Sequence, residues 1–176
     1  YRTVSGYTNP DESEHDFFNV GHTSTSISLA SGLAKARDLK KEDYNVVAVI
    51  GDGSLSGGEA LEGLNFAGSE LNSNFIIIVN DNQQSIAENH GGLYKNLDKL
   101  RETNGQASNN LFKAMGLDYI YEADGNNIEK MIELFQKIKD NTLKVSNKKL
   151  ILFSITSALI LFSYGVIVSL NTRNLC

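Results

Sequence analysis

Two short apolar runs, separated by a stretch of helical periodicity, constrain the fold more than any other feature of the chain. Residues Asn45 to Ile50 and Asn74 to Val79 are rich in β-branched side chains, as is typical of strands buried on both faces. Between them, Ser56 to Ser69 carries small and apolar residues at helical spacing. A strand, a helix and a second strand in this order predict a parallel unit of an α/β sheet.

The segments on either side extend the same architecture. Thr25 to Arg37 predicts a helix whose small side chains allow close packing against a neighbour. Further elements are predicted downstream, in chain order: helices near Leu97 to Glu102 and Asn109 to Met115, a strand at Asp118 to Glu122, and an amphipathic helix at Asn127 to Ile138. We therefore expect an α/β domain with a mostly parallel sheet and helices on both faces.

Charge and cysteine content narrow the class of protein. The formal net charge is -5 and the lysines are scattered, so we expect no nucleic-acid partner. The single cysteine, Cys176, excludes a disulfide framework and favours a cytoplasmic protein. The chain starts at Tyr1 without a methionine or a signal peptide, which indicates a fragment of a longer protein.

The carboxyl-terminal part departs from the alternating pattern. Residues 150–170 are uncharged and long enough to span a membrane, with lysines before them and Arg173 after them. Three interpretations remain open: a sheet strand at 150–155 followed by unrelated sequence, a frameshifted or disrupted tail, or a membrane span. We accordingly divide the chain into a domain at 1–142 and a divergent tail at 143–176, through which membrane association is one alternative.

Polar motifs follow the two predicted strands at the point where each ends. Gly51-Asp52-Gly53 comes after the first strand, and Asn80-Asp81-Asn82 after the second. Ligands bind at the carboxyl ends of strands in open parallel sheets. Carboxylate and amide oxygens are suitable ligands for Mg²⁺, and the glycines would allow a tight turn close to a phosphate group. Each motif by itself is also an ordinary turn, so the prediction depends on the pair.

The paired motifs at this spacing resemble the thiamine diphosphate motif. A more specific likeness begins upstream, with Ser13-Glu14-His15-Asp16 and the run from Gly21 to Ser28. Together with the two strand-end motifs, these segments resemble the 1-deoxy-D-xylulose-5-phosphate synthase family of the transketolase superfamily. The resemblance covers about residues 5 to 142 and implies a thiamine diphosphate-binding fold.

The resemblance also implies roles for individual residues. Three residues would hold magnesium: Asp52, Asn82 and, through its backbone carbonyl, Gln84. The implied cofactor-binding residues are Gly21, His22, Thr23, Gly53, Ser54 and Asn82. Thr23 stands where the family usually has serine, and it keeps the hydroxyl. His22 is the implied catalytic residue because imidazole can transfer protons near neutral pH; its alternative is a turn histidine that caps the next helix.

The activity implied by the resemblance is a thiamine diphosphate-dependent transferase reaction. Pyruvate and D-glyceraldehyde 3-phosphate would condense with loss of carbon dioxide, supplying precursors for isoprenoid, thiamine and pyridoxal synthesis. The family places a glutamate against the cofactor's aminopyrimidine ring in a separate pyrimidine-binding domain, and its enzymes are expected to be homodimers. We expect this chain, without that domain or a companion chain, to be inactive by itself. The alternatives are a transketolase-type two-carbon transferase and a non-catalytic, membrane-tethered remnant.

Overall fold

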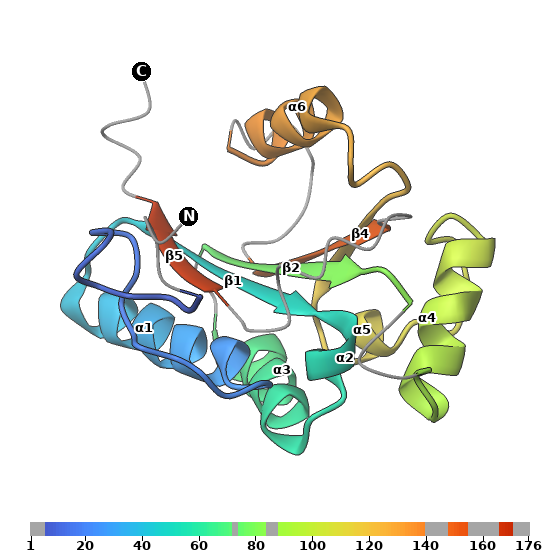
Figure 1. The fold of residues 1–176 in the computed structure, drawn as a ribbon, viewed down its shortest axis with the longest axis horizontal. Coiled ribbons are helices and arrows are strands. Elements are labelled where there is room, and N and C mark those ends of the chain that lie inside the picture. The colour runs from blue at the N-terminus through green and yellow to red at the C-terminus, as the bar shows by residue number, and fades with distance from the viewer. Residues whose placement is uncertain (1–5, 72–73, 84–87, 140–147, 155–165, 171–176) are drawn as a thin grey trace.

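A computed structural model describes residues 6–71, 74–83, 88–139, 148–154 and 166–170 (Figure 1). The strands are β1 (Asn45–Gly51), β2 (Phe75–Asp81), β3 (Asp118–Glu122), β4 (Lys148–Ser154) and β5 (Val166–Leu170). The helices are α1 (Ser26–Lys40), α2 (Asp52–Leu55), α3 (Gly58–Glu70), α4 (Gly92–Glu102), α5 (Leu111–Ala114) and α6 (Ile128–Lys139). From β1 to β4, at least one helix follows each strand before the next begins, as the sequence pattern predicts.

The described strands form one mostly parallel sheet in the order β3-β4-β2-β1-β5. The pairs β1 with β2, β2 with β4 and β3 with β4 are parallel, whereas β5 runs antiparallel to β1 at one edge. The register joins Val46 to Phe75 and continues to Gly51 and Asn80. The next residues, Asp52 and Asp81, therefore lie side by side where the two strands end.

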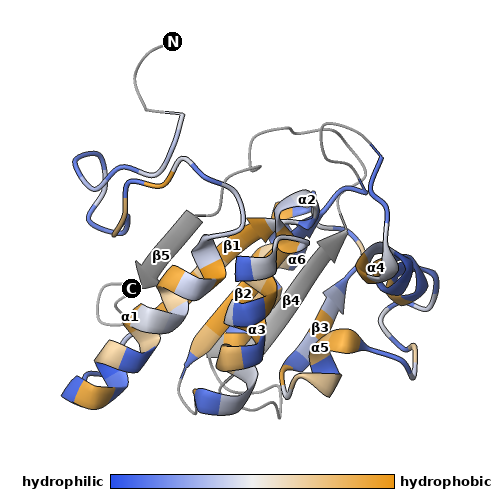
Figure 2. Ribbon diagram, turned by 90° about the horizontal axis from the view of Figure 1, so that it is seen from below, coloured by the Kyte–Doolittle hydropathy of each residue, from blue (hydrophilic) through white to orange (hydrophobic). Residues whose placement is uncertain are grey.

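The main core lies on one face of the sheet, beneath α1, α3, α4 and α5. Alternate residues of β1 (Val46, Ala48, Ile50) and of β2 (Phe75, Ile77, Val79) point into it and are fully buried. Figure 2 shows these hydrophobic strands with α1 and α3 packed across them. Burial of such side chains stabilises the fold by roughly 2 kcal/mol each, before chain entropy is subtracted.

Helix α6 covers the opposite face (Figure 1). Its side chains Met131, Leu134, Phe135 and Ile138 pack against Ile76 and Ile78 of β2 and Ile120 of β3. Their spacing of three and four residues produces the apolar stripe from which this helix is predicted. The expectation of an α/β fold with helices on both faces is confirmed.

Small residues bring α1 and α3 together. A Cβ atom at Gly63 of α3 would lie 2.8 Å from Oγ of Ser28 and 2.9 Å from its backbone nitrogen. Ser28 Oγ also donates a hydrogen bond of 2.8 Å to the carbonyl of Glu59. The close packing predicted from the small residues of α1 is thus present, with glycine on the facing helix.

The predicted elements differ from the observed ones mainly at their ends. Helix α4 begins at Gly92, five residues before the predicted start near Leu97. The glycine pair at 91 and 92 indicates a loop, but Gly91 has a φ of 120° and precedes the helix, while Gly92 is its first residue. Leu97 and Leu100 are buried in the main core and hold the helix in place.

The apolar tail is partly in the sheet. Residues 148–154 form β4, which pairs with β2 on one side and β3 on the other, in line with the interpretation of 150–155 as a strand. Residues 166–170 form β5, and 155–165 lie outside the described residues. In the described part of the chain, no helix is both long and apolar enough to cross a membrane, so the predicted span over 150–170 finds no support. The division of domains at residue 142 stays a prediction.

Candidate functional site

The first glycine motif forms a junction between a strand and a helix. Gly51 ends β1 with a φ of -79°, and Asp52 opens the single turn of α2. Positive φ angles occur elsewhere among the described glycines, so neither Gly51 nor Gly53 needs the conformational freedom of glycine here. The chain turns directly from β1 into the single turn of α2, and the expected approach of these glycines to a phosphate group stays a prediction. Helix α3, predicted to start at Ser56, starts two residues later.

The segment from Gly21 to Ser24 lies against α2 although thirty residues separate them in sequence. Ser24 Oγ donates a hydrogen bond of 2.7 Å to the carbonyl of Ser54. A Cβ atom at Gly57 would lie 2.1 Å from the same Oγ, so this position has room for glycine and for little more. Ser24 itself has a φ of 72°, which is unusual for a residue other than glycine. The structure thus brings the two predicted cofactor-binding segments together.

His22 is exposed in this segment, as are Gly21 and Thr23. Its Nδ1 atom lies 2.8 Å from the carbonyl of Thr23, and its own carbonyl accepts a hydrogen bond from Thr25 Oγ1. Thr25 is the N-cap residue of α1, so the imidazole does not cap that helix. The proposed role of His22 in catalysis stays a prediction.

Asp52 is a buried carboxyl group at the end of β1. It is 2% exposed, and its Oδ2 accepts a hydrogen bond of 2.9 Å from the side-chain amide of Asn89. Burial, reinforced by the nearby charge of Asp81, raises the pKa of Asp52 from 3.8 to about 6. Within the described part of the chain, no cationic side chain forms an ion pair with Asp52. A cation bound there would compensate a carboxylate charge that no ion pair among the described residues balances.

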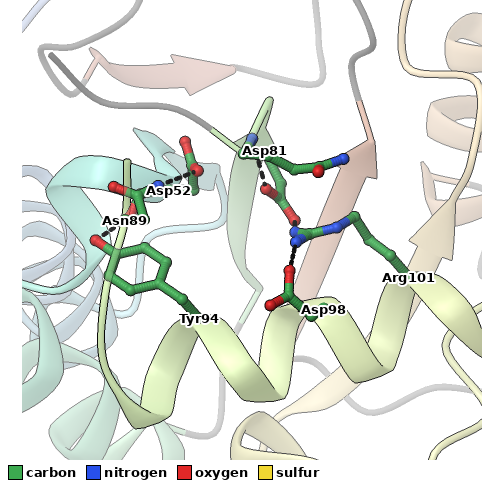
Figure 3. A network of polar contacts seen from close by, with 7 residues as sticks. Asp52, Asp81, Asn89, Tyr94, Asp98 and Arg101 are labelled. Atoms are coloured by element: carbon green, nitrogen blue, oxygen red, sulfur yellow. Dashed lines mark hydrogen bonds and ion pairs between the residues drawn. The ribbon is translucent and has the colours of Figure 1, made fainter. Parts of the chain in front are cut away.

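Asp81, at the end of β2, is balanced by a cation of the protein. It is fully buried and forms an ion pair with Arg101 of α4, which also contacts Asp98 (Figure 3). The backbone N–H of Gln83 donates to its second oxygen, at 3.2 Å. Burial raises the pKa of Asp81, and Arg101 opposes this effect. The two neighbouring acids therefore differ in their surroundings, although both end a strand.

Helix α4 also contacts the backbone of the first motif. The hydroxyl of Tyr94 lies 3.4 Å from the carbonyl oxygens of both Asp52 and Gly53. Figure 3 shows Tyr94 and Asn89 on the Asp52 side of the network and Arg101 on the Asp81 side. The side chains of Asn89, Tyr94 and Arg101 therefore connect the two strand ends.

The other predicted metal ligands are described in part. Asn82 follows directly on Asp81 and is half-buried, whereas Gln84 lies outside the described residues. Asn80 Oδ1 is buried and accepts no hydrogen bond from the described part of the chain, which is unusual for a buried polar atom. The residues that the structure describes contain no group of three or more His, Cys, Asp or Glu side chains that could bind a metal. A cation at Asp52 would therefore need amide, backbone, phosphate or water oxygens to complete its shell.

Sequence reasoning overlooked the contribution of α4. Three contact residues on α4 or just before it, Asn89, Tyr94 and Arg101, belong to no recognisable motif. Asp81 lies in the second strand-end motif, but the resemblance implies no role for it. One signal was available: Tyr94 and Arg101 are seven residues apart, which places them on one face of a helix. That signal cannot show which part of the protein the face contacts.

Comparison with known families decides what kind of protein carries this site. The model of the 1-deoxy-D-xylulose-5-phosphate synthase family matches residues 1–110, more than half of the chain. The chain belongs to the 1-deoxy-D-xylulose-5-phosphate synthase family. The resemblance drawn from the sequence motifs is thereby confirmed, and the matched range includes every predicted site residue.

Individual members of the family agree with this assignment. A 1-deoxy-D-xylulose-5-phosphate synthase from Clostridium beijerinckii is 43% identical over 175 residues, covering 80% of this chain. One from Heliobacterium modesticaldum is 44% identical over 148 residues and covers 84% of the chain. The chain spans 28% and 20% of the length of these two relatives.

A solved structure of transketolase from Pichia stipitis aligns with 80% of this chain and 21% of its own, with a TM-score of 0.42 and 18% identity.

Proposed function

We propose that this chain supplies the magnesium- and diphosphate-binding half of a thiamine diphosphate-dependent 1-deoxy-D-xylulose-5-phosphate synthase. In the whole enzyme, a transferase, pyruvate would condense with D-glyceraldehyde 3-phosphate and lose carbon dioxide. The remaining length of the relatives would contribute the pyrimidine-binding domain, and a homodimer is the expected assembly. The chain by itself is proposed to bind cofactor without turning over substrate.

The observation that carries this proposal is the environment of Asp52. A carboxyl group that is 2% exposed, next to a second buried acid and hydrogen-bonded by a neutral amide, is costly to ionise. A divalent cation at its oxygen would remove that cost, and oxygen ligands suit magnesium. Since Arg101 already pairs with Asp81, Asp52 is the better candidate ligand of the two acids.

The other predicted residues fit the same arrangement. Asn82 would add an amide oxygen to the cation, and the backbone of Gln84 a third protein ligand. Gly53 and Ser54 lie on α2 beside Asp52, where they would contact the diphosphate. The Ser24 hydrogen bond holds the segment of Gly21, His22 and Thr23 next to α2, so these residues would line the cofactor.

When bound, thiamine diphosphate supplies the carbanion that such condensations require. The residues of this chain would fix the diphosphate end through the cation and so orient the reactive ring. His22 is exposed at the rim of this site and is proposed to accept or donate protons near the reacting carbon.

Calorimetric titration of the full chain with thiamine diphosphate and Mg²⁺ tests the proposal. We expect binding that is lost when Mg²⁺ is removed by a chelator and in Asp52→Asn, which keeps the shape of the side chain but removes its charge. The matched control is Asp43→Asn, at an exposed position just before β1 and thus at the other end of that strand from Asp52. This variant should bind as the parent does.

Binding should also weaken as the pH falls through about 6, because protons then compete with the cation for Asp52. No binding by the folded chain, or binding that survives both chelation and Asp52→Asn, would contradict the proposed function.

A further inference from the structure

Helix α4 and the residues just before it contact both Asp52 and Asp81, the first through neutral hydrogen-bond donors and the second through an ion pair. Asn89 donates an amide hydrogen to the carboxylate of Asp52, whose backbone carbonyl lies 3.4 Å from the hydroxyl of Tyr94. Two turns further along α4, Arg101 forms its ion pair with Asp81 (Figure 3). Asp52 thus receives neutral donors, and Asp81 receives a full positive charge.

The ion pair between Arg101 and Asp81 is shielded from water. The Asp81 side chain is 0% exposed and that of Arg101 is 12% exposed, so the pair is screened little by salt. Asp98 is the second partner of Arg101 and is 59% exposed, which makes its share of the interaction weaker. The negative charge of Asp81 is therefore neutralised by Arg101 of the same chain.

This division of charge matters for binding a diphosphate. A divalent cation held by one carboxylate keeps a net charge of about +1, which attracts the negatively charged diphosphate. A cation held by two carboxylates would be close to neutral and would lose that attraction. Asp52 and Asp81 directly follow Gly51 and Asn80, which face each other in the register of β1 and β2, so both acids are within reach of one site.

We propose that Arg101 is a positioning residue that holds Asp81 away from the cation, leaving Asp52 as the single carboxylate ligand. The bound cation then retains positive charge for the diphosphate. The inference rests on the proposed function in one respect, because it takes Asp52 as the residue that binds the cation.

Titration of the full chain with Mn²⁺ at pH 8 in the absence of cofactor, followed by the electron paramagnetic resonance signal of free Mn²⁺, tests this role. Arg101→Gln frees Asp81 and should tighten Mn²⁺ binding about tenfold. Asp81→Asn leaves Arg101 near Asp52 with the exposed Asp98 as its remaining ion-pair partner, and should weaken Mn²⁺ binding by a similar factor. If the ion pair were merely structural, removing either partner would weaken Mn²⁺ binding. Opposite signs are therefore the signature of the proposed role.

The matched control is Lys99→Gln, which removes a positive charge from an exposed position of the same helix, where Lys99 pairs with Glu102. It should leave Mn²⁺ affinity within about twofold of the parent. Should Arg101→Gln fail to fold, the double variant Arg101→Gln/Asp81→Asn takes its place, because it removes both partners of the buried pair. It should bind Mn²⁺ more tightly than Asp81→Asn alone, whereas a merely structural ion pair predicts binding as weak in the double variant as in the single one.

The proposal would be overturned if Arg101→Gln and Asp81→Asn both weakened Mn²⁺ binding, or if Arg101→Gln bound Mn²⁺ with the same affinity as Lys99→Gln. This readout does not involve thiamine diphosphate. A chain that binds no cofactor but shows the opposite shifts in Mn²⁺ affinity would contradict the proposed function while supporting the role of Arg101.

Discussion

At the scale of single residues, buried polar groups show how function and stability compete in this protein. Arg37 of α1 is 2% exposed and donates to the backbone carbonyls of Tyr44 and Asn74, so its charge joins a helix to the starts of two strands. Asp52 is equally buried, but its strongest contact in the described part of the chain is an amide. Arg37 stabilises the fold through these hydrogen bonds, whereas the ionised form of Asp52 destabilises it.

We expect Asp52→Asn to stabilise the cofactor-free protein at pH 8. The pKa of Asp52 is raised from 3.8 to about 6, so the stability that this group contributes is complete below pH 4 and is lost as the pH rises through 6. Two units of pKa correspond to about 3 kcal/mol, of which the variant should recover about 2 kcal/mol. Urea denaturation at pH 8 and at pH 4, with a chelator present, measures the difference.

At pH 4 the two proteins should unfold at similar urea concentrations, because the parent carboxyl is then mostly protonated. Asp43→Asn should show no gain at either pH, since that position is exposed. A variant that is less stable than the parent at both pH values would disprove this account of Asp52.

At the scale of elements, glycine determines how closely segments approach. A Cβ atom at Gly68 of α3 would lie 1.7 Å from the carbonyl oxygen of Met115, at the end of α5, so these two helices meet backbone to backbone. Gly57 has the same function between the Ser24 segment and the start of α3. Both positions are conformationally permissive for alanine, since neither has a positive φ, and the constraint is one of space.

We expect Gly57→Ala to displace the segment of Ser24, because its Cβ would lie 2.5 Å from the Cβ of Ser24. The variant should lose the hydrogen bond to Ser54 and about 1 to 3 kcal/mol of stability. Gly58→Ala is the matched control: the site is open, with nothing within 4 Å, and alanine favours the helix by about 0.5 to 1 kcal/mol. Urea denaturation of both variants decides the matter, and equal stability would refute the packing argument.

At the scale of the whole molecule, the sheet joins parts of the chain that are distant in sequence. Strand β4 lies between β2 and β3 and pairs with both, so it joins β3 to the rest of the described sheet. The residues that complete the sheet therefore come after position 142, where the sequence pattern suggested a boundary. A parallel strand in the interior of a sheet is paired on both sides, and its removal exposes two rows of backbone groups.

We expect a chain that ends at residue 142 to fold poorly. Without β4, the hydrogen bonds that β4 makes with β2 and with β3 are lost, so β3 is no longer joined to the rest of the sheet. Circular dichroism and urea denaturation should show lower cooperativity, or aggregation, in the shortened protein than in the full chain. A shortened chain as stable as the full one would mean that β4 contributes nothing, and that the predicted domain 1–142 is self-sufficient.

Local patterns determined much of this protein. The apolar runs at 45–50 and 74–79 predict β1 and β2 because buried parallel strands need apolar side chains on both faces. The motifs containing Asp52 and Asn82 could be located at the strand ends because they follow these runs directly. The family was recognisable for the same reason, since its motifs are continuous in sequence.

Tertiary structure decided the rest. The pairing of Asp81 with Arg101, twenty residues away, and the lack of such a partner for Asp52 within the described residues depend on where α4 packs. The use of 148–154 as a strand depends on the space between β2 and β3, because an uncharged run is compatible with a strand or a membrane span. Charge balance and burial are properties of neighbours in space, and periodicity along the chain contains no information about which neighbours these are.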